Sequence, residues 1–120
     1  MRKTILCVDD ELYWLNTLRR WLSDQYELVF MEDARAALIR LEQEDIALTI
    51  TDLEMRDMGG VEFAGRIKER WPRLRVLLWT GHPDPPFSRA DLTLDKSAAL
   101  SAGEAHFRRI VAEMLDSGKK

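Results

Sequence analysis

The chain has 120 residues, a formal net charge of −3 and a hydrophobic fraction of 46%, values that suit one compact domain over residues 1–120. This charge excludes a strong general attraction to nucleic acids or acidic membranes, and a single cysteine excludes a disulfide framework and a CxxC metal site. We expect a cytoplasmic protein, because the first residues pass directly into a strand pattern and no apolar run is long enough for a signal peptide or a membrane span.

Strand and helix patterns alternate along the chain. Short β-branched and apolar runs are typical of buried strands, and apolar positions at helical spacing predict the helices between them. The predicted strands cover residues 4–8, 27–31, 46–51, 74–79 and 92–94. The predicted helices cover residues 10–24, a stretch after Asp33, residues 61–70, and a last segment opened by a capping box at Ser101–Glu104.

Strict alternation of strands and helices predicts a parallel sheet with helices on both faces. In such a sheet, the residues that follow the strands meet at one edge, where ligands bind. Charged or hydroxylated residues follow four of the predicted strands: Asp9, Asp10, Asp52, Thr80 and Lys96.

These residue types suit phosphoryl chemistry. Clustered carboxylates repel one another and lower stability unless a cation offsets them, and their hard oxygens suit Mg²⁺ better than zinc or copper. Lys96 adds a point charge for an anion, Thr80 adds one directional hydrogen bond, and Asp52 can act as a nucleophile that forms an acyl phosphate. The chain lacks both a GxxxxGK[ST] loop and a GxGxxG turn, which argues against nucleotide binding.

The arrangement resembles the receiver domain of two-component response regulators over nearly the whole chain. The matching stretches are Ile-Leu-Cys-Val-Asp9-Asp10-Glu11, Thr-Asp52-Leu-Glu-Met-Arg-Asp-Met-Gly-Gly60, Leu-Leu-Trp-Thr80-Gly and Asp-Lys96. The resemblance implies a flavodoxin-like, doubly wound sheet of five parallel strands in the order 2-1-3-4-5.

The resemblance also implies roles for individual residues. Asp52 would accept a phosphoryl group from a histidine kinase or a histidine phosphotransfer protein. Asp10, Asp9 through water, Asp52 and the backbone carbonyl of Glu54 would hold Mg²⁺. Thr80 would donate a hydrogen bond to the phosphoryl group and Lys96 would pair with it, after which a two-state equilibrium shifts.

The chain departs from the family pattern at several positions. Arg56 replaces the usual proline after the phosphoryl acceptor, which frees the loop backbone, and Ser97 replaces the proline that usually follows the lysine. Thr93 stands where the family commonly has an aromatic residue, so the usual threonine–aromatic coupling cannot operate through it. The segment between Thr80 and Lys96 is short and rich in proline, so we expect a fourth helix that is absent or about one turn long after Phe87.

Three functions are consistent with this pattern. The first is a Mg²⁺-dependent phosphorelay receiver, a signalling domain rather than a metabolic enzyme. The second is a pseudo-receiver, an interaction module that signals without phosphorylation. The third is a flavodoxin-like cofactor binder, although the carboxylates would repel a flavin phosphate.

We expect an unknown output partner or domain and no direct contact with nucleic acid or membrane. A homodimer is left open. Each site residue also has a bland interpretation, such as a helix-start charge cluster for Asp9 and Asp10 or a surface position for Lys96.

Overall fold

The computed structural model describes residues 2–117 as a three-layer α/β domain. The strands are β1 (Thr4–Val8), β2 (Glu27–Met31), β3 (Leu48–Asp52), β4 (Arg75–Thr80) and β5 (Leu92–Asp95). The helices are α1 (Leu12–Leu22), α2 (Ala34–Gln43), α3 (Gly60–Arg70), α4 (Lys96–Ala102) and α5 (Glu104–Ser117). The strands pair in parallel in the order β2-β1-β3-β4-β5, which confirms the expected flavodoxin-like sheet.

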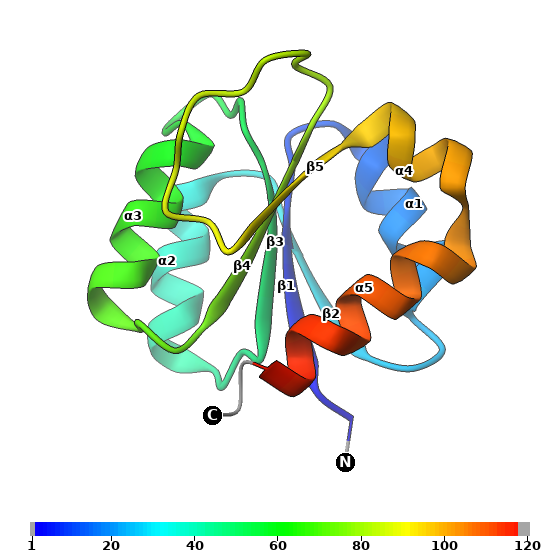
Figure 1. Cartoon of the computed structure of the whole chain (residues 1–120). Helices are drawn as coiled ribbons and strands as arrows, with labels where there is room; N and C mark the ends of the chain where they lie inside the picture. The colour runs from blue at the N-terminus through cyan, green and yellow to red at the C-terminus, as the bar shows by residue number, and fades with distance from the viewer. Residues whose placement is uncertain (1, 118–120) are drawn as a thin grey trace.

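Helices cover both faces of the sheet, and each face has its own apolar core (Figure 1). The core under α1 and α5 contains Trp21, Trp79 and Phe107, whereas the core under α2 and α3 contains Phe63 and Ile67. The central strand β3 is buried at every position, as expected for a strand covered on both sides. Within residues 2–117, no helix is both long enough and apolar enough to cross a membrane.

The connection from β4 to β5 contains no helix, as the proline-rich sequence predicted. It lies on the same side of the sheet as α2 and α3 (Figure 1), and the guanidinium of Arg89 donates to the α3 carbonyl of Gly65 over 3.4 Å. Strand β5 therefore lacks a covering helix on that side. Its residues alternate between partly buried and exposed along the strand. Leu92 and Leu94 pack against the core under α5, while Thr93 is exposed.

Asp91 fastens the end of this connection to its neighbours. Its carboxylate accepts a hydrogen bond from the backbone N–H of Val76 at 2.7 Å, and pairs with Lys68 of α3 at 2.6 Å and with Arg75 at 3.2 Å. These side chains are mostly buried, so the contacts are less screened than surface pairs. A cluster of polar contacts thus anchors the end of the helix-free connection.

The short helix α4 lies after β5, where the sequence predicted no helix before residue 101. The carboxylate of Asp95 caps it by accepting the backbone N–H of Ala98 at 2.9 Å. The predicted capping box was wrong, because Ser101 lies inside α4 and the last helix begins at Glu104. Gly103 separates the two helices with a φ of 91°, a conformation that favours glycine.

Gly60 lies so close to the backbone of Asp52 and Leu53 that the structure has no room for a side chain at this position. A Cβ at this position would lie 2.3 Å from the carbonyl oxygen of Asp52, so we expect Gly60→Ala to lower the free energy of unfolding by about 2–3 kcal/mol. Gly65 lies in the same helix with no heavy atom within 4 Å of such a Cβ. Gly65→Ala should therefore raise stability by about 0.5–1 kcal/mol. Urea unfolding followed by tryptophan fluorescence measures both, and equal effects would contradict the contact.

Candidate functional site

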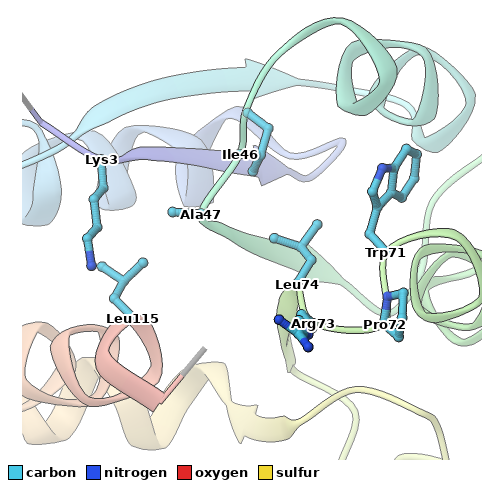
Figure 2. Close-up of a pocket in the computed structure, with 8 residues that line it drawn as sticks. All are labelled: Lys3, Ile46, Ala47, Trp71, Pro72, Arg73, Leu74 and Leu115. Atoms are coloured by element: carbon cyan, nitrogen blue, oxygen red, sulfur yellow. The ribbon is translucent and has the colours of Figure 1, made fainter. Parts of the chain in front are cut away.

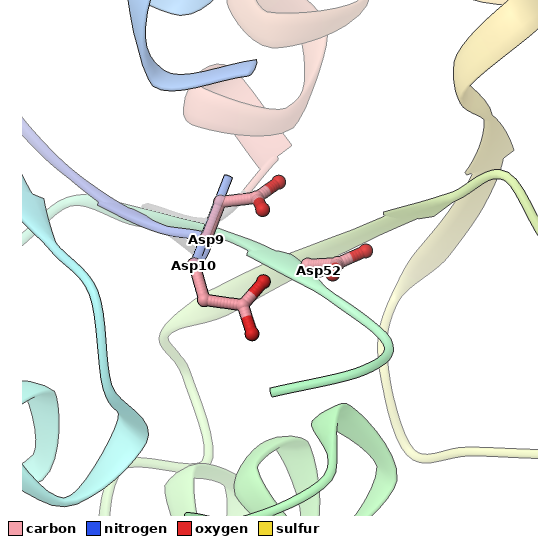
Figure 3. A group of neighbouring side chains, drawn as sticks. All are labelled: Asp9, Asp10 and Asp52. Atoms are coloured by element: carbon pink, nitrogen blue, oxygen red, sulfur yellow. The ribbon is translucent and has the colours of Figure 1, made fainter. Parts of the chain in front are cut away.

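Three carboxylates meet at the carboxyl edge of the sheet. Asp9 and Asp10 follow β1, and Asp52 ends the neighbouring strand β3. One carboxylate oxygen from each lies within 4.8 Å of the others, and the three side chains point to the same side of the edge (Figure 3). Because Val8 pairs with Thr51, the parallel register places the next residues, Asp9 and Asp52, side by side.

Lys96 supplies the opposite charge. Its ammonium Nζ donates to Oδ2 of Asp9 at 2.8 Å and to Oδ1 of Asp52 at 3.0 Å. The lysine side chain is 4% exposed, although it is the first residue of α4 and no peptide bond among residues 2–117 is cis. The interpretation of Lys96 as a surface residue was therefore wrong.

Asp9 is the most buried of the carboxylates, with no exposed surface. Burial raises the pKa of Asp9 to about 6, and the charge of Asp52 acts in the same direction. The hydrogen bond and charge of Lys96, together with the backbone N–H of Glu11, act in the opposite direction. Desolvation is the larger effect, so Asp9 keeps its proton to a higher pH than an ordinary aspartate despite its cationic neighbour.

The other predicted site residues line the same cleft. Thr80 is 2% exposed and lies at the end of β4, where its hydroxyl accepts the backbone N–H of His82 at 3.0 Å. Glu54 also lines the cleft and Asp9 pairs with Lys96 beneath it, so the structure brings every predicted site residue together.

Sequence reasoning missed Trp14, which lines this cleft beside Lys96. No spacing in the sequence indicated this position, because Asp10 precedes α1 and Lys96 lies far along the chain.

The loop after β3 is restrained by Asp57 rather than by a proline. The Asp57 carboxylate accepts the backbone N–H groups of Ala34 at 3.1 Å and of Arg35 at 2.8 Å, at the start of α2. Partial burial raises the pKa of Asp57, but these backbone hydrogen bonds outweigh it and hold the pKa below the usual value. The loop that Arg56 was expected to free is therefore tied to a neighbouring helix.

A second hollow lies at the opposite edge of the sheet, before the strands begin (Figure 2). It is lined by Lys3, Ile46, Ala47, Trp71, Pro72, Arg73, Leu74 and Leu115. This lining contains no carboxylate, hydroxyl or thiol side chain, so it offers neither a nucleophile nor a hard metal ligand.

The fold and this cleft define a doubly wound α/β domain with three clustered carboxylates at one edge of its sheet. A family model, the response regulator receiver domain, matches residues 5–101. The chain therefore belongs to the response regulator receiver domain family. A simple charge cluster at a helix start would not explain why Asp9 and Asp10 lie beside Asp52 in a chain of this family.

Several relatives are similar over different lengths. The response regulator receiver protein CpdR of Brucella abortus is 28% identical over 119 residues, covering 95% of this chain and 94% of that protein. The hydrogenase transcriptional regulatory protein HoxA of Cupriavidus necator is 31% identical over 81 residues, covering 68% of this chain and 17% of that protein. The chain thus spans less than a fifth of the length of HoxA, and likewise of the response regulator FleR of Pseudomonas aeruginosa.

Solved structures show the same fold. The signal receiver domain of an HD domain-containing protein from Pseudomonas fluorescens has a TM-score of 0.88 at 25% identity, covering 98% of this chain and 90% of that one. The response regulator TrrA of Thermotoga maritima, solved in complex with Mg²⁺-BeF, has a TM-score of 0.82 at 27% identity, covering 93% and 98%.

Asp57→Ala tests whether this side chain restrains the loop. The variant should lose about 1 kcal/mol of stability at neutral pH, since it leaves two backbone donors without their charged acceptor. The folded pKa is lowered, so this contribution is complete above the unfolded aspartate pKa of about 3.9 and is lost as pH falls through the folded value. Unfolding curves from pH 7 to pH 2 should converge with those of the wild type. A constant gap at all pH values would contradict the charge-assisted anchor, and the exposed Asp45→Ala serves as control.

Proposed function

We propose that this chain is a phosphorelay receiver that accepts a phosphoryl group on Asp52 in a Mg²⁺-dependent reaction and thereby changes the binding of a partner. One observation carries the proposal: the Lys96 ammonium is held within hydrogen-bonding distance of both Asp9 and Asp52 inside a cleft that also contains Thr80. This cluster brings a nucleophile, a cation and a hydroxyl to one edge.

The carboxylates fit a Mg²⁺ ion by their chemistry and spacing. Asp9, Asp10 and Asp52 offer hard oxygen ligands within 4.8 Å of one another, and the backbone carbonyl of Glu54 is the further ligand that we propose. When bound, Mg²⁺ would offset the negative charge of the carboxylates and of the incoming phosphoryl oxygens. Asp10 is the half-buried member and hence the one most open to a hydrated ion.

The chain's own residues would perform the transfer. An Oδ atom of Asp52 attacks the phosphorus of the donor, a P–O bond to Asp52 forms, and the bond to the donor breaks so that its leaving group keeps the electron pair. Lys96 moves its charge towards the phosphoryl oxygens as the negative charge of Asp52 is consumed, and the Thr80 hydroxyl donates one hydrogen bond to them.

We assign the donor as a histidine kinase or a histidine phosphotransfer protein, by family. The proposal leaves open which partner or domain receives the signal and whether the chain forms a homodimer. We propose no direct nucleic-acid contact, because the formal net charge is −3 and four basic side chains around α3 pair with carboxylates of the chain itself. These pairs are Arg66–Glu62, Lys68–Asp91, Arg70–Glu42 and Arg75–Asp91. We further propose a cytoplasmic signalling domain without metabolic enzyme activity and without membrane contact.

The alternative is a pseudo-receiver that binds partners without phosphorylation. The helix-free connection between β4 and β5, and the exposed Thr93 in place of an aromatic residue, favour this alternative. Both features alter the region through which the family generally signals. They leave the acidic cleft itself complete.

Mg²⁺ should stabilise the wild type, because an ion that binds only the folded state shifts the unfolding equilibrium. At ten times the dissociation constant we expect the melting temperature to rise by about 5 °C. Asp10→Asn should remove most of this shift while raising the melting temperature without metal, since it relieves repulsion among the carboxylates. Asp45→Asn, at an exposed position outside the cleft, should keep the wild-type shift. A wild type that shows no shift would contradict the Mg²⁺ site.

Acetyl phosphate separates the two functions. With Mg²⁺, the wild type should gain one phosphoryl group by intact-mass spectrometry, with release of acetate, and Asp52→Asn should gain none. If the wild type binds Mg²⁺ but keeps its unmodified mass, the pseudo-receiver is the correct function.

A further inference from the structure

Lys96 lies against two tryptophan rings as well as two carboxylates. Its Nζ atom is 4.9 Å from the centroid of the Trp14 ring and 5.6 Å from that of Trp79. Both distances are within the range of about 6 Å over which a cation is attracted to an aromatic face. Because the lysine side chain is 4% exposed, water screens this attraction only weakly.

The two rings support one another. Trp14 meets Trp79 edge to face with centroids 5.2 Å apart, and Trp79 packs on Phe107 of α5 at 5.4 Å. Trp79 has no exposed surface, and its indole N–H has no hydrogen-bond partner in the described part of the chain. Packing therefore sets the orientation of its ring. Trp14 is only half-buried and is the ring that borders the open cleft.

Lys96 needs such a restraint in this chain. It follows β5, a four-residue edge strand whose crossover carries no helix, and it is followed by Ser97 rather than a ring-constrained residue. The two carboxylates fix the ammonium from the side of β1 and β3. Without a second surface, the flexible four-carbon stem of the lysine would let the ammonium follow either carboxylate.

We propose that Trp14 is a positioning residue for Lys96. Its indole face, supported by Trp79, holds the ammonium at the point where a phosphoryl group on Asp52 would need it. The proposal rests on the proposed receiver function for its kinetic consequence, whereas the contact between the ring and the lysine is independent of that function. Trp14 acts through its contact with Lys96 and is neither a metal ligand nor a hydrogen-bond donor to the phosphoryl group in the proposed reaction.

The test compares two substitutions at one position with a matched control. Trp14→Leu keeps an apolar side chain but removes the aromatic face, and Trp14→Phe keeps a smaller aromatic face. Trp21→Leu makes the same change in the same helix, at a ring that packs on Phe107 and not on Lys96. The readouts are the rate of phosphorylation by acetyl phosphate, the Mg²⁺ dissociation constant and the NMR shifts of the Lys96 ε-methylene protons.

We expect Trp14→Leu to slow phosphorylation about tenfold, and Trp14→Phe and Trp21→Leu to stay within about threefold of the wild type. Mg²⁺ affinity should not weaken in Trp14→Leu, since no metal ligand is lost and the competing ammonium is held less firmly. A general structural defect would instead weaken Mg²⁺ binding and slow phosphorylation together, and that result would overturn the proposal. So would equal rates for Trp14→Leu and Trp14→Phe.

The NMR readout decides the contact even if the wild type takes no phosphoryl group. Ring currents from the two indoles should move the Lys96 ε-methylene protons upfield in the wild type and in Trp21→Leu, and most of this displacement should disappear in Trp14→Leu. Unchanged shifts in Trp14→Leu would overturn the inference, whereas a wild type that stays unphosphorylated would overturn only the proposed function.

Discussion

The ammonium of Lys96 between Asp9 and Asp52 is the contact on which the rest of the site depends. Two nearly buried carboxylates on adjacent strands repel one another, and each has lost most of its hydration. The lysine offsets both effects at once and so stabilises the acidic edge. A cation that displaced this ammonium would find the carboxylate oxygens already close together.

The geometry of the acidic edge is set by two inner strands of the sheet. Asp9 and Asp52 extend from β1 and β3, which pair in register and are covered on both faces. Gly60 lets α3 start directly against the carbonyl of Asp52, and Asp57 fastens the intervening loop to α2. The carboxylates therefore lie on a rigid frame. Lys96, the first residue of α4, brings its charge to them from the end of the edge strand β5.

Local patterns in the sequence were enough to predict the sheet, its order by resemblance, and the convergence of Asp9, Asp10, Asp52, Thr80 and Lys96. The prolines also predicted the helix-free connection, because proline removes backbone donors. Helix α4 was missed because its sequence, Lys-Ser-Ala-Ala-Leu-Ser-Ala, has no apolar stripe and its start depends on the Asp95 cap. The Asp57 anchor and the indole contacts of Lys96 join residues far apart in the chain, and no spacing rule reveals such pairs.

The edge position of β5 gives the site two regions of unequal local stability. Hydrogen bonds and packing protect β1 and β3 from both sides, whereas β5 has one neighbouring strand and an irregular crossover. Partial opening of this edge would withdraw the ammonium while the carboxylates stayed folded. The charge balance of the cleft would then depend on whether this edge is closed, because departure of the lysine would leave three carboxylates that attract a cation more strongly.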